Sequence, residues 1–521
     1  MVLIHLPVTG ITSDVLVDAL LRKQYFPNIK KTSGEELPPY FSSESLTDAA
    51  AADLLNLESR DRGVVRFGTR KFDGLVRPMG LPHPVAHVRL VNHLGKYWTH
   101  LDARLGSEQS KIAPRHHDDG RVLTMDYDDQ LTESNAQTQA ATGRRFVVKA
   151  DISNCFGSIY THAVDWALRG RDAARRGRRD NSWEHKLDLQ LQRCNGGETK
   201  GINIGPAVSN IVAEFILQEV DLKLAGILAT AFPRSGLQFT RNIDDYTLSC
   251  DTNDQAELFL TALGQELAHF RLSLNGRKTS VQPTVGGIGE RWIADIHLRL
   301  PDPTEAEKAV RFVQWLGYHA DDVPGKSVAR YGAKTLVKER LKTGQADESD
   351  LILADELLRL AFHRPETLCF AVQHLEWSGS KFDGNNRVRL GHSLHQLLEQ
   401  AAQRRETDTA LWAMRGLESL SRTEELNSKS TRDALIALED DLVWLVLAHL
   451  HRDGMNEVAT AAELLNAGNN GDVPEDIVEE HWLARYELHR TERLQEVNLS
   501  KFEKQWFKKA INHSVSFSIL T

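Results

Sequence analysis

The sequence predicts an α+β region followed by an all-α, repeat-like region. Between about residues 64 and 300, short β-branched runs alternate with amphipathic stretches, which is typical of a sheet packed against helices. From about residue 304 onward the strand pattern ends and a series of helical patterns follows. Two prolines in the segment LRLPDPTEAEK mark the junction. We therefore expect an N-terminal helical and loop segment at 1–63, an α+β domain at 64–300 and a helical domain at 301–521.

The individual elements follow from local patterns. Thr12, Ser13 and Asp14 are suited to cap a helix that continues to Leu21, and prolines mark the loop after it. The expected strands are Val64–Phe67, Phe146–Val148, Phe239–Arg241 and Tyr246–Cys250. The expected C-terminal helices are Glu305–Leu316, Ala329–Leu341, Asp350–Phe362, Leu394–Gln403, Thr409–Leu420, Arg432–Leu450, Met455–Leu465 and Glu475–Leu494.

Length and composition limit the class of protein. A chain of 521 residues exceeds one ordinary domain. Its formal net charge of -9 counts mildly against nucleic-acid binding, although a local basic channel can coexist with an acidic helical region. No run of about 18 apolar residues occurs, so we expect no membrane span. Four cysteines without a C-x-x-C pair or zinc spacing favour a reducing, cytoplasmic compartment.

Three aspartates stand where phosphoryl transfer would need them. The strand pattern Arg145–Ala150 ends at Asp151, and two later strand patterns flank a turn that contains Asp244 and Asp245. Adjacent carboxylates between apolar strands repel each other, which is costly unless a cation lies between them. Nucleotidyl transfer uses two hard cations, and magnesium prefers carboxylate oxygens. The pattern predicts a metal site; a solvated hairpin turn is the alternative.

Several segments resemble the motifs of reverse transcriptases, in the family's order. DISNCFGSIY, beginning at Asp151, resembles the first catalytic motif, and RNIDDY, beginning at Arg241, resembles the aromatic-x-Asp-Asp motif. GINIGPAVSNIVAE, from Gly201, resembles the Gly-rich segment and palm helix, and LNGRKT, from Leu274, resembles the Leu-Asn-x-x-Lys-Thr motif. RKFDGLVRPMGLPHP, from Arg70, resembles the fingers hairpin. The resemblance implies a right-hand polymerase with palm and fingers.

The resemblance also implies roles for single residues. Asp151 and Asp244 would be catalytic and hold two Mg²⁺ or Mn²⁺ ions, with Asp245 supporting and Ile152 also at the metal site. Phe156 falls where the family keeps an aromatic ring under the sugar, which selects deoxynucleotides.

The remaining substrate contacts that the resemblance implies are cationic or glycine positions. Lys278 would lie near the pyrophosphate, where a cation eases its departure. Gly205 would allow close approach of template or nucleotide, and Lys71 and Arg77 would face the triphosphate. A surface hairpin is the alternative for Lys71 and Arg77, a solvated turn lysine for Lys278 and core packing for Phe156.

Two positions depart from the family pattern. Asn242 stands where the family has the aromatic beside the primer end, and Ile204 stands where a glutamine is common. The carboxylates are kept while contacts to an ordinary primer-template are changed, which suggests unusual priming: by protein, without a template, or on a non-coding RNA. Tyr25 and Tyr40 are the candidates for a priming hydroxyl, with Tyr246 a third by proximity; packed or surface aromatics are the alternative.

The branch of the family is indicated by LPHP, from Leu81, and EHWLARYEL, from Glu480, together with the long helical region. These resemble bacterial reverse transcriptases of the abortive-infection (Abi) type. That resemblance implies antiphage defence in the bacterial cytoplasm, a homo-oligomer, and dNTPs with RNA or single-stranded DNA as partners. The competing interpretations are a non-catalytic nucleic-acid-binding palm that recruits partners through its helical domain, and a metal-dependent nuclease.

One further feature is a run of arginines after the first catalytic motif. Its members are Arg169, Arg171, Arg175, Arg176, Arg178 and Arg179. Such a cluster is suited to contact template or product phosphates, and a solvated loop is the alternative.

Overall fold

The computed structural model describes residues 9–27, 37–71, 74–106, 108–123, 137–177, 180–286, 291–347, 349–451, 479–494 and 499–518. The chain forms two compact units, each built from separate stretches of sequence. Unit 1 contains residues 1–25, 46–64 and 81–291, and unit 2 contains residues 26–45, 65–80 and 292–521.

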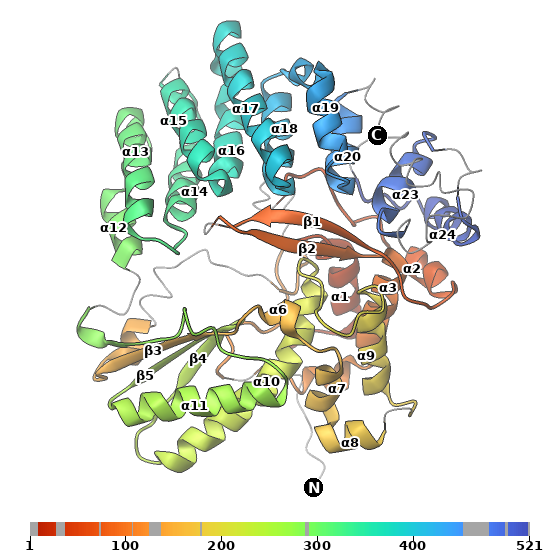
Figure 1. The fold of residues 1–521 in the computed structure, drawn as a ribbon, viewed down its shortest axis with the longest axis vertical. Helices are drawn as coiled ribbons and strands as arrows, with labels where there is room; N and C mark the ends of the chain where they lie inside the picture. The colour runs from red at the N-terminus through yellow and green to blue at the C-terminus, as the bar shows by residue number, and fades with distance from the viewer. Residues whose placement is uncertain are drawn as a thin grey trace. The chain divides into compact units, whose positions relative to one another are not determined.

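Unit 1 has a four-stranded antiparallel sheet with helices around it (Figure 1). Its strands are β3 (Phe146–Asp151), β4 (Phe239–Asn242), β5 (Asp245–Cys250) and β6 (Ser280–Pro283). Its helices are α1 (Ser13–Asp18), α2 (Asp48–Leu55), α3 (Pro84–Lys96), α4 (Trp98–Asp102), α6 (Cys155–Ser158), α7 (His162–Arg169), α8 (Arg171–Arg176), α9 (Trp183–Arg193), α10 (Ala207–Ala231) and α11 (Asn253–His269).

The sheet of unit 1 has the order β4-β5-β3-β6, and every neighbouring pair of strands described is antiparallel. The register pairs Phe146 with Cys250 at one end of β3 and β5, and Asp151 with Asp245 at the other. Because β4 and β5 are joined by a turn, this register brings the end of β3 beside the turn that follows Asn242. The strands near 146, 239 and 246 that the sequence predicts are confirmed.

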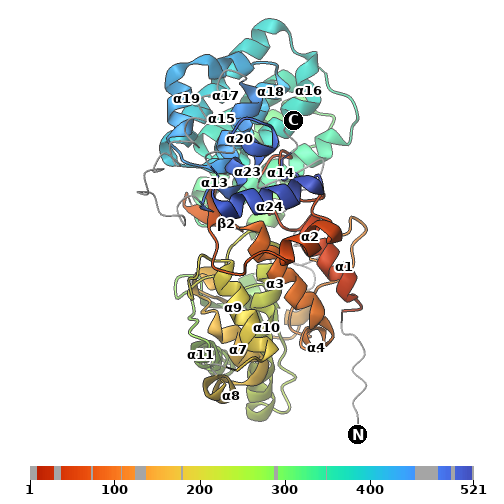
Figure 2. The ribbon, with the colours of Figure 1, turned by 90° about the vertical axis from the view of Figure 1, so that its right-hand side faces the viewer.

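Helix α11 packs against α10 and against strands β3 and β5 of the sheet (Figure 1). Most of the buried positions of α10 are apolar, including Phe215 and Ile216, so burial rather than one amphipathic stripe determines where this helix lies. Its buried face also contains Glu214 and Asp221. Helix α7 lies beside both α9 and α10 (Figure 2).

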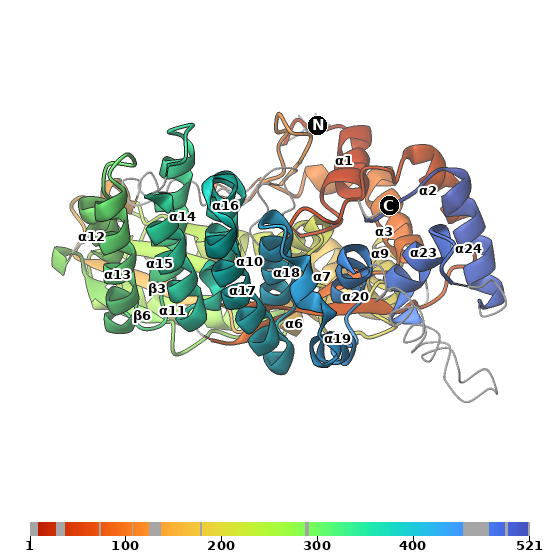
Figure 3. The same cartoon turned by 90° about the horizontal axis from the view of Figure 1, so that it is seen from above.

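Unit 2 combines a hairpin with a series of helices, seen in sequence from α13 to α20 in Figure 3. The hairpin strands are β1 (Val64–Arg70) and β2 (Val76–Pro82). The first residue of β1 and the last two of β2 belong to unit 1. The helices are α12 (Arg291–Arg299), α13 (Ala306–Asp322), α14 (Val328–Leu341), α15 (Asp350–His363), α16 (Leu368–Ser378), α17 (Gly384–Arg404), α18 (Thr407–Ser419), α19 (Lys429–Ile436), α20 (Asp441–Leu450), α23 (Trp482–Arg490) and α24 (Lys501–Asn512).

Most of the predicted C-terminal helices are confirmed, with one correction. The pattern Arg432–Leu450 predicts a single helix, but α19 ends at Ile436 and α20 begins at Asp441. Glu439 has a φ of 53°, a left-handed conformation that no helix continues through, and the Asp440 side chain caps α20. The predicted helix Met455–Leu465 lies outside the described residues, as does the first part of Glu475–Leu494.

Polar contacts fix the hairpin within unit 2. The Gly68 amide donates to Thr407 Oγ1 at 2.9 Å, and Thr407 Oγ1 donates to Asp440 Oδ2 at 2.5 Å. The Arg70 amide donates to Asp408 Oδ2 at 2.9 Å, and its guanidinium pairs with Glu406 at 2.5 Å. The hairpin therefore attaches to the first turn of α18.

Candidate active site

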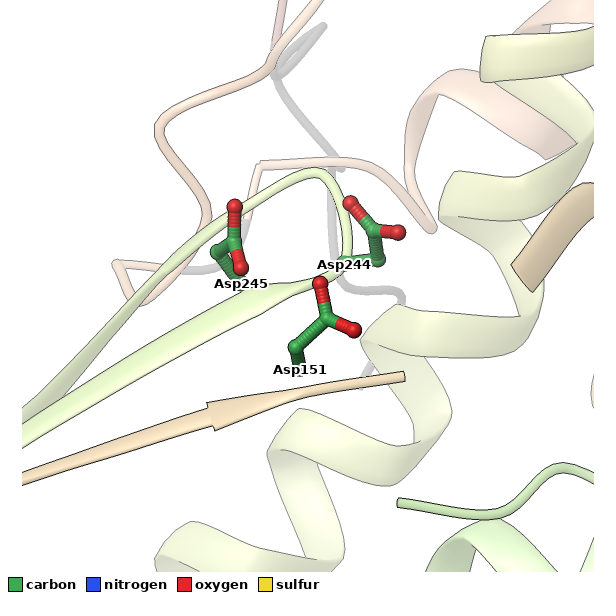
Figure 4. Close-up of side chains that lie close together, drawn as sticks. All are labelled: Asp151, Asp244 and Asp245. Carbon is green, nitrogen blue, oxygen red and sulfur yellow. The ribbon is translucent and has the colours of Figure 1, made fainter. Parts of the chain in front are cut away.

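Three aspartates meet at the end of β3. One carboxylate oxygen from each of Asp151, Asp244 and Asp245 lies within 4.8 Å of the others. Figure 4 shows the three side chains gathered where the β4–β5 turn passes the end of β3. Asp151 is buried, Asp244 is half-buried and Asp245 is exposed, so the cluster opens to solvent on one side.

The convergence follows from the backbone. Asp151 pairs with Asp245 across β3 and β5, and the Ile152 amide donates to the carbonyl of Asp244 at 3.2 Å. Asn242 pairs with Asp245, which leaves Ile243 and Asp244 as a two-residue turn. Ile243 has a φ of 56°, which is strained for a β-branched residue.

A third segment completes the site from the other side of Asp151. Lys278 Nζ lies 2.8 Å from Asp151 Oδ1, and Asn275 Nδ2 donates to Asp151 Oδ2 at 3.0 Å. The Asn275 amide also donates to the Asp151 carbonyl at 2.7 Å. Both oxygens of this buried carboxylate thus have a partner from the LNGRKT segment.

The site concentrates negative charge. Although Asp245 is open to solvent, lost hydration around its carboxyl, with the like charges of Asp244 and Asp151, raises its pKa to about 7. Burial acts to lower the pKa of Lys278, but its hydrogen bond and ion pair with Asp151 outweigh burial and raise it. A single lysine does not neutralise three carboxylates, and such an arrangement favours cations.

A buried ion cluster lies under the turn. Arg241 is fully buried, and its guanidinium contacts Glu214 Oε1 at 2.7 Å and Asp221 Oδ2 at 2.8 Å, both on α10. Its Nη1 also donates to the carbonyl of Ile243 at 2.9 Å. The hydroxyl of Tyr246 donates to Asp221 Oδ1 at 2.9 Å. The guanidinium therefore links the aspartate turn to the long helix.

The Gly-rich segment packs on α6. The Ile202 amide donates to the Phe156 carbonyl at 3.0 Å, and the Gly201 amide donates to the Ile159 carbonyl at 2.8 Å. A Cβ on Gly201 would lie 3.5 Å from the Gly157 carbonyl and would need a φ of +87°. Phe156 is half-buried, and Gly205 has a φ of +133°. The structure therefore brings the segments of Phe156 and Gly205 together.

The other predicted site residues lie elsewhere. Lys71 and Arg77 are both half-buried residues of the β1–β2 hairpin segment, within unit 2. Tyr25 is buried in unit 1, where its hydroxyl donates to the Pro82 carbonyl. Tyr40 is buried in unit 2, and its hydroxyl lies 2.6 Å from Glu418 Oε2. Their roles in substrate binding and priming stay predictions.

Four residues that support the site were not predicted from the sequence: Asn275, Arg241, Glu214 and Asp221. The sequence does contain a signal for Glu214 and Asp221. They stand seven residues apart, on one side of a largely apolar helix, and carboxylates buried there need a cation as partner. Asn275 belongs to the motif quoted above, but only the antiparallel bridge between Ile152 and Leu274 brings it to Asp151.

The donor set fits divalent metal. Asp151, Asp244 and Asp245 offer only carboxylate oxygens, which are the ligands that Mg²⁺ and Mn²⁺ take in proteins. Ile152 is buried beside them, and its backbone amide donates a hydrogen bond to the backbone carbonyl of Asp244. Among the described residues, no other group of three or more His, Cys, Asp or Glu side chains is spaced to hold a metal ion.

Comparisons with known proteins agree with this geometry. Residues 105–320 match the family model described as "Reverse transcriptase (RNA-dependent DNA polymerase)", so the chain contains a reverse transcriptase domain. The palm-type α+β fold followed by a helical region, as predicted from the sequence, is confirmed. No curated protein matches the chain. Within the described ranges, no helix has the length and apolar character that a membrane crossing requires.

Solved telomerase structures are distant neighbours. Apo telomerase from Candida tropicalis aligns with a TM-score of 0.30 and 11% identity over 74% of this chain and 68% of that chain. Telomerase from Candida albicans, in complex with a TWJ fragment of telomeric RNA, aligns with a TM-score of 0.28 and 11% identity over 72% of this chain and 62% of that chain.

Proposed function

We propose that this chain is a DNA polymerase that adds deoxynucleotides by two-metal nucleotidyl transfer. The observation that carries the proposal is the meeting of Asp151, Asp244 and Asp245, with oxygens within 4.8 Å, inside the matched domain. Two Mg²⁺ ions, when bound, would supply positive charge to the triphosphate and the attacking oxygen.

The protein's own residues would act around that centre. Asp151 and Asp244 would hold the ions and Asp245 would support them, with Ile152 fixing the end of β3 against the turn. Lys278, whose side chain is 60% exposed, would leave Asp151 and turn toward the departing pyrophosphate. Lys71 and Arg77 would contribute charge toward the triphosphate.

Incorporation of labelled dNTPs with Mg²⁺ tests this proposal directly. Asp244→Asn is expected to lower incorporation at least 100-fold while keeping the unfolding temperature of the wild type. Asp254→Asn, an exposed aspartate in the first turn of α11, is the matched control and should keep full activity. Persistent synthesis by Asp244→Asn would refute the mechanism; no synthesis by the wild type, with nucleic acid bound, would favour a non-catalytic scaffold.

Sugar selection is proposed to depend on Phe156. A ring at this position, on α6 against the Gly-rich segment, would exclude a 2′-hydroxyl. Phe156→Ala should raise the use of rNTPs relative to dNTPs, and Phe156→Tyr should not. An unchanged ratio in Phe156→Ala would contradict the assignment.

The priming mode is proposed to be unusual. Asn242 and Ile204 stand where the family has residues that contact an ordinary primer-template. Asn242 is half-buried beside the aspartate turn, and Ile204 is half-buried within the Gly-rich segment. The burial of the Tyr25 and Tyr40 hydroxyls argues against priming by either one without rearrangement. A denaturing protein gel after labelling separates the modes: label on the protein indicates self-priming, and label that requires added RNA indicates a template.

We also propose a role in antiphage defence in the bacterial cytoplasm, as a homo-oligomer. This rests on the resemblance to abortive-infection enzymes and is supported by the long helical region of unit 2. Phage plating on cells that express the wild type or Asp244→Asn tests it. Equal efficiency of phage plating on the two strains would contradict a defence role that depends on DNA synthesis.

A further inference from the structure

A basic and aromatic surface lies on unit 1 where α7, α8, α10 and the end of α11 meet. An open pocket there is lined by Arg104, Trp166, Arg169, Arg171, Lys223 and Phe270, among others. Of its charged lining residues, Glu219 alone is acidic. The formal charge of the whole chain is -9, so this surface is locally opposite to the average.

Stacked arginine and aromatic groups extend the pocket. The guanidinium of Arg171 lies 4.8 Å from the ring centre of Trp166. That of Arg271 lies 4.6 Å from Tyr160 and 5.8 Å from Trp166. The Tyr160 and Trp166 rings are 5.7 Å apart. We call Tyr160, Trp166, Arg171 and Arg271 the basic-aromatic strip.

The strip's arginines are not committed to ion pairs. Arg169 is held by Asp165 and Asp180, and Lys223 by Glu219 at 3.5 Å. By contrast, neither Arg171 nor Arg271 has a carboxylate partner among the residues that the structure describes, and both side chains are exposed. Two cations held over aromatic rings remain available to an external anion.

Arg271 stands in a conformation that favours glycine. It follows α11 with a φ of 65°, in a helix-ending turn in which the Leu272 amide donates to the Leu267 carbonyl. An arginine at such a position accepts steric strain at its Cβ that a glycine would avoid. The strip is also linked to the candidate active site through the backbone. The carbonyl of Ser273, two residues after Arg271, accepts a hydrogen bond from the amide of Ser153, two residues after Asp151.

From these observations we propose that the basic-aromatic strip binds single-stranded nucleic acid. Bases would stack on Trp166 and Tyr160 while the arginines pair with phosphates, the combination that single-strand binding uses. The pocket, at about 250 Å³, is below the roughly 300–1,000 Å³ of pockets that enclose a small molecule, which favours an extended ligand that touches it locally. This inference deepens the proposed polymerase function, since the strand would be its product or template.

Binding without synthesis provides the test. A fluorescein-labelled 12-nucleotide oligo-dT is titrated with the full chain in EDTA, without dNTPs, across a salt series. Trp166→Ala is expected to weaken binding about ten-fold, because a base can no longer stack there. Arg171→Ala with Arg271→Gly is expected to reduce the log–log salt slope by about 1.4, which is about 0.7 for each phosphate that an arginine no longer neutralises.

The variants have matched controls. Glycine suits the left-handed position of residue 271, so Arg271→Gly removes the guanidinium without strain. Unit 2 contains a comparable pair, in which the Arg299 guanidinium lies 5.0 Å from the Trp315 ring, so Trp315→Ala and Arg299→Ala serve as controls. Photocrosslinking of an iododeoxyuridine oligonucleotide, followed by peptide mapping, should label residues 160–171.

Several outcomes would overturn the inference. The first is that the strip variants bind the oligonucleotide with the same affinity and salt slope as the control variants. The second is that all crosslinks fall outside residues 160–171. The third is that poly-glutamate of equal charge displaces the oligonucleotide, which would indicate a site for acidic peptides. Because no dNTP is present, the outcome is separate from that of the proposed function. A wild type that synthesises nothing can still bind through the strip, and failure of the strip inference leaves the aspartate chemistry intact.

Discussion

Arg241 Nη1 lies 2.9 Å from the carbonyl oxygen of Ile243, the residue whose φ of 56° allows the chain to turn into Asp244. The same guanidinium is held from the other side by Glu214 and Asp221 of α10. The turn that carries two aspartates is thus supported by a buried charge rather than by apolar packing alone. This arrangement makes the position of Asp244 depend on residues that are not metal ligands.

Replacing this cation should destabilise unit 1 strongly. Arg241→Met would leave Glu214 and Asp221 buried without their cation, and breaking a buried pair in this way costs about 3–5 kcal/mol. Urea unfolding measured by circular dichroism checks the value. Arg311→Met, at an exposed pair with Glu307 on α13, should change stability by less than about 0.5 kcal/mol. Equal effects of the two changes would mean that the buried cluster contributes nothing.

Lys278 should compete with the first metal ion. Because its ammonium contacts Asp151 Oδ1 at 2.8 Å, Lys278→Met is expected to tighten Mn²⁺ binding in the absence of nucleotide by about five-fold, the size of a partly exposed ion pair. The same change should lower dNTP incorporation at least ten-fold. Manganese titration followed by electron paramagnetic resonance, with Lys429→Met at an exposed surface pair as control, provides the check. Weaker Mn²⁺ binding by Lys278→Met would contradict the competition.

Thr407 should determine how firmly the hairpin is held in unit 2. Thr407→Val keeps the shape but removes the acceptor for the Gly68 amide and the donor to Asp440, at about 1–3 kcal/mol in total. Hydrogen exchange of the Gly68 amide should become faster. Thr335→Val, which removes only a bond to a carbonyl within α14, should leave that exchange rate unchanged. Unaltered exchange in Thr407→Val would show that the strand is held by other contacts.

Asp440 should make the stability of unit 2 dependent on pH. Burial raises the pKa of its carboxyl to about 6, above the value of about 3.9 for an unfolded aspartate. The folded state therefore binds a proton that the unfolded state has released, so the stabilisation present below about pH 4 is lost as the pH rises to 6 and beyond.

Asp440→Asn removes this titration and keeps an N-cap acceptor for the amides of Leu442 and Val443. As the pH rises from 4 to 7, the unfolding temperature of the wild type should therefore fall relative to that of Asp440→Asn. Differential scanning calorimetry at several pH values measures it. A difference that stays constant across this range would show that Asp440 is ionised in the folded protein throughout.

Local sequence patterns determined much of the fold. Strands β3, β4 and β5 and most helices of unit 2 lie where alternation and helical periodicity predict them, because both signals arise within a few consecutive residues. The helix break before Asp441 was not predicted, because the apolar pattern continues across it and only the left-handed Glu439 interrupts the helix. The assignment of the β1–β2 hairpin to unit 2 was likewise not predicted, since it depends on contacts to residues more than 330 positions away.

The candidate site divides in the same way. The sequence alone determined which residues carry the chemistry: an aspartate at a strand end, an aspartate pair in a tight turn, and a lysine after them. The tertiary structure alone decided that Asp151 stands opposite Asp245, that Asn275 and Lys278 reach Asp151, and that Arg241 is enclosed by α10. The physical reason is that strand register and the burial of a charge depend on partners distant in the chain, which a local pattern does not specify.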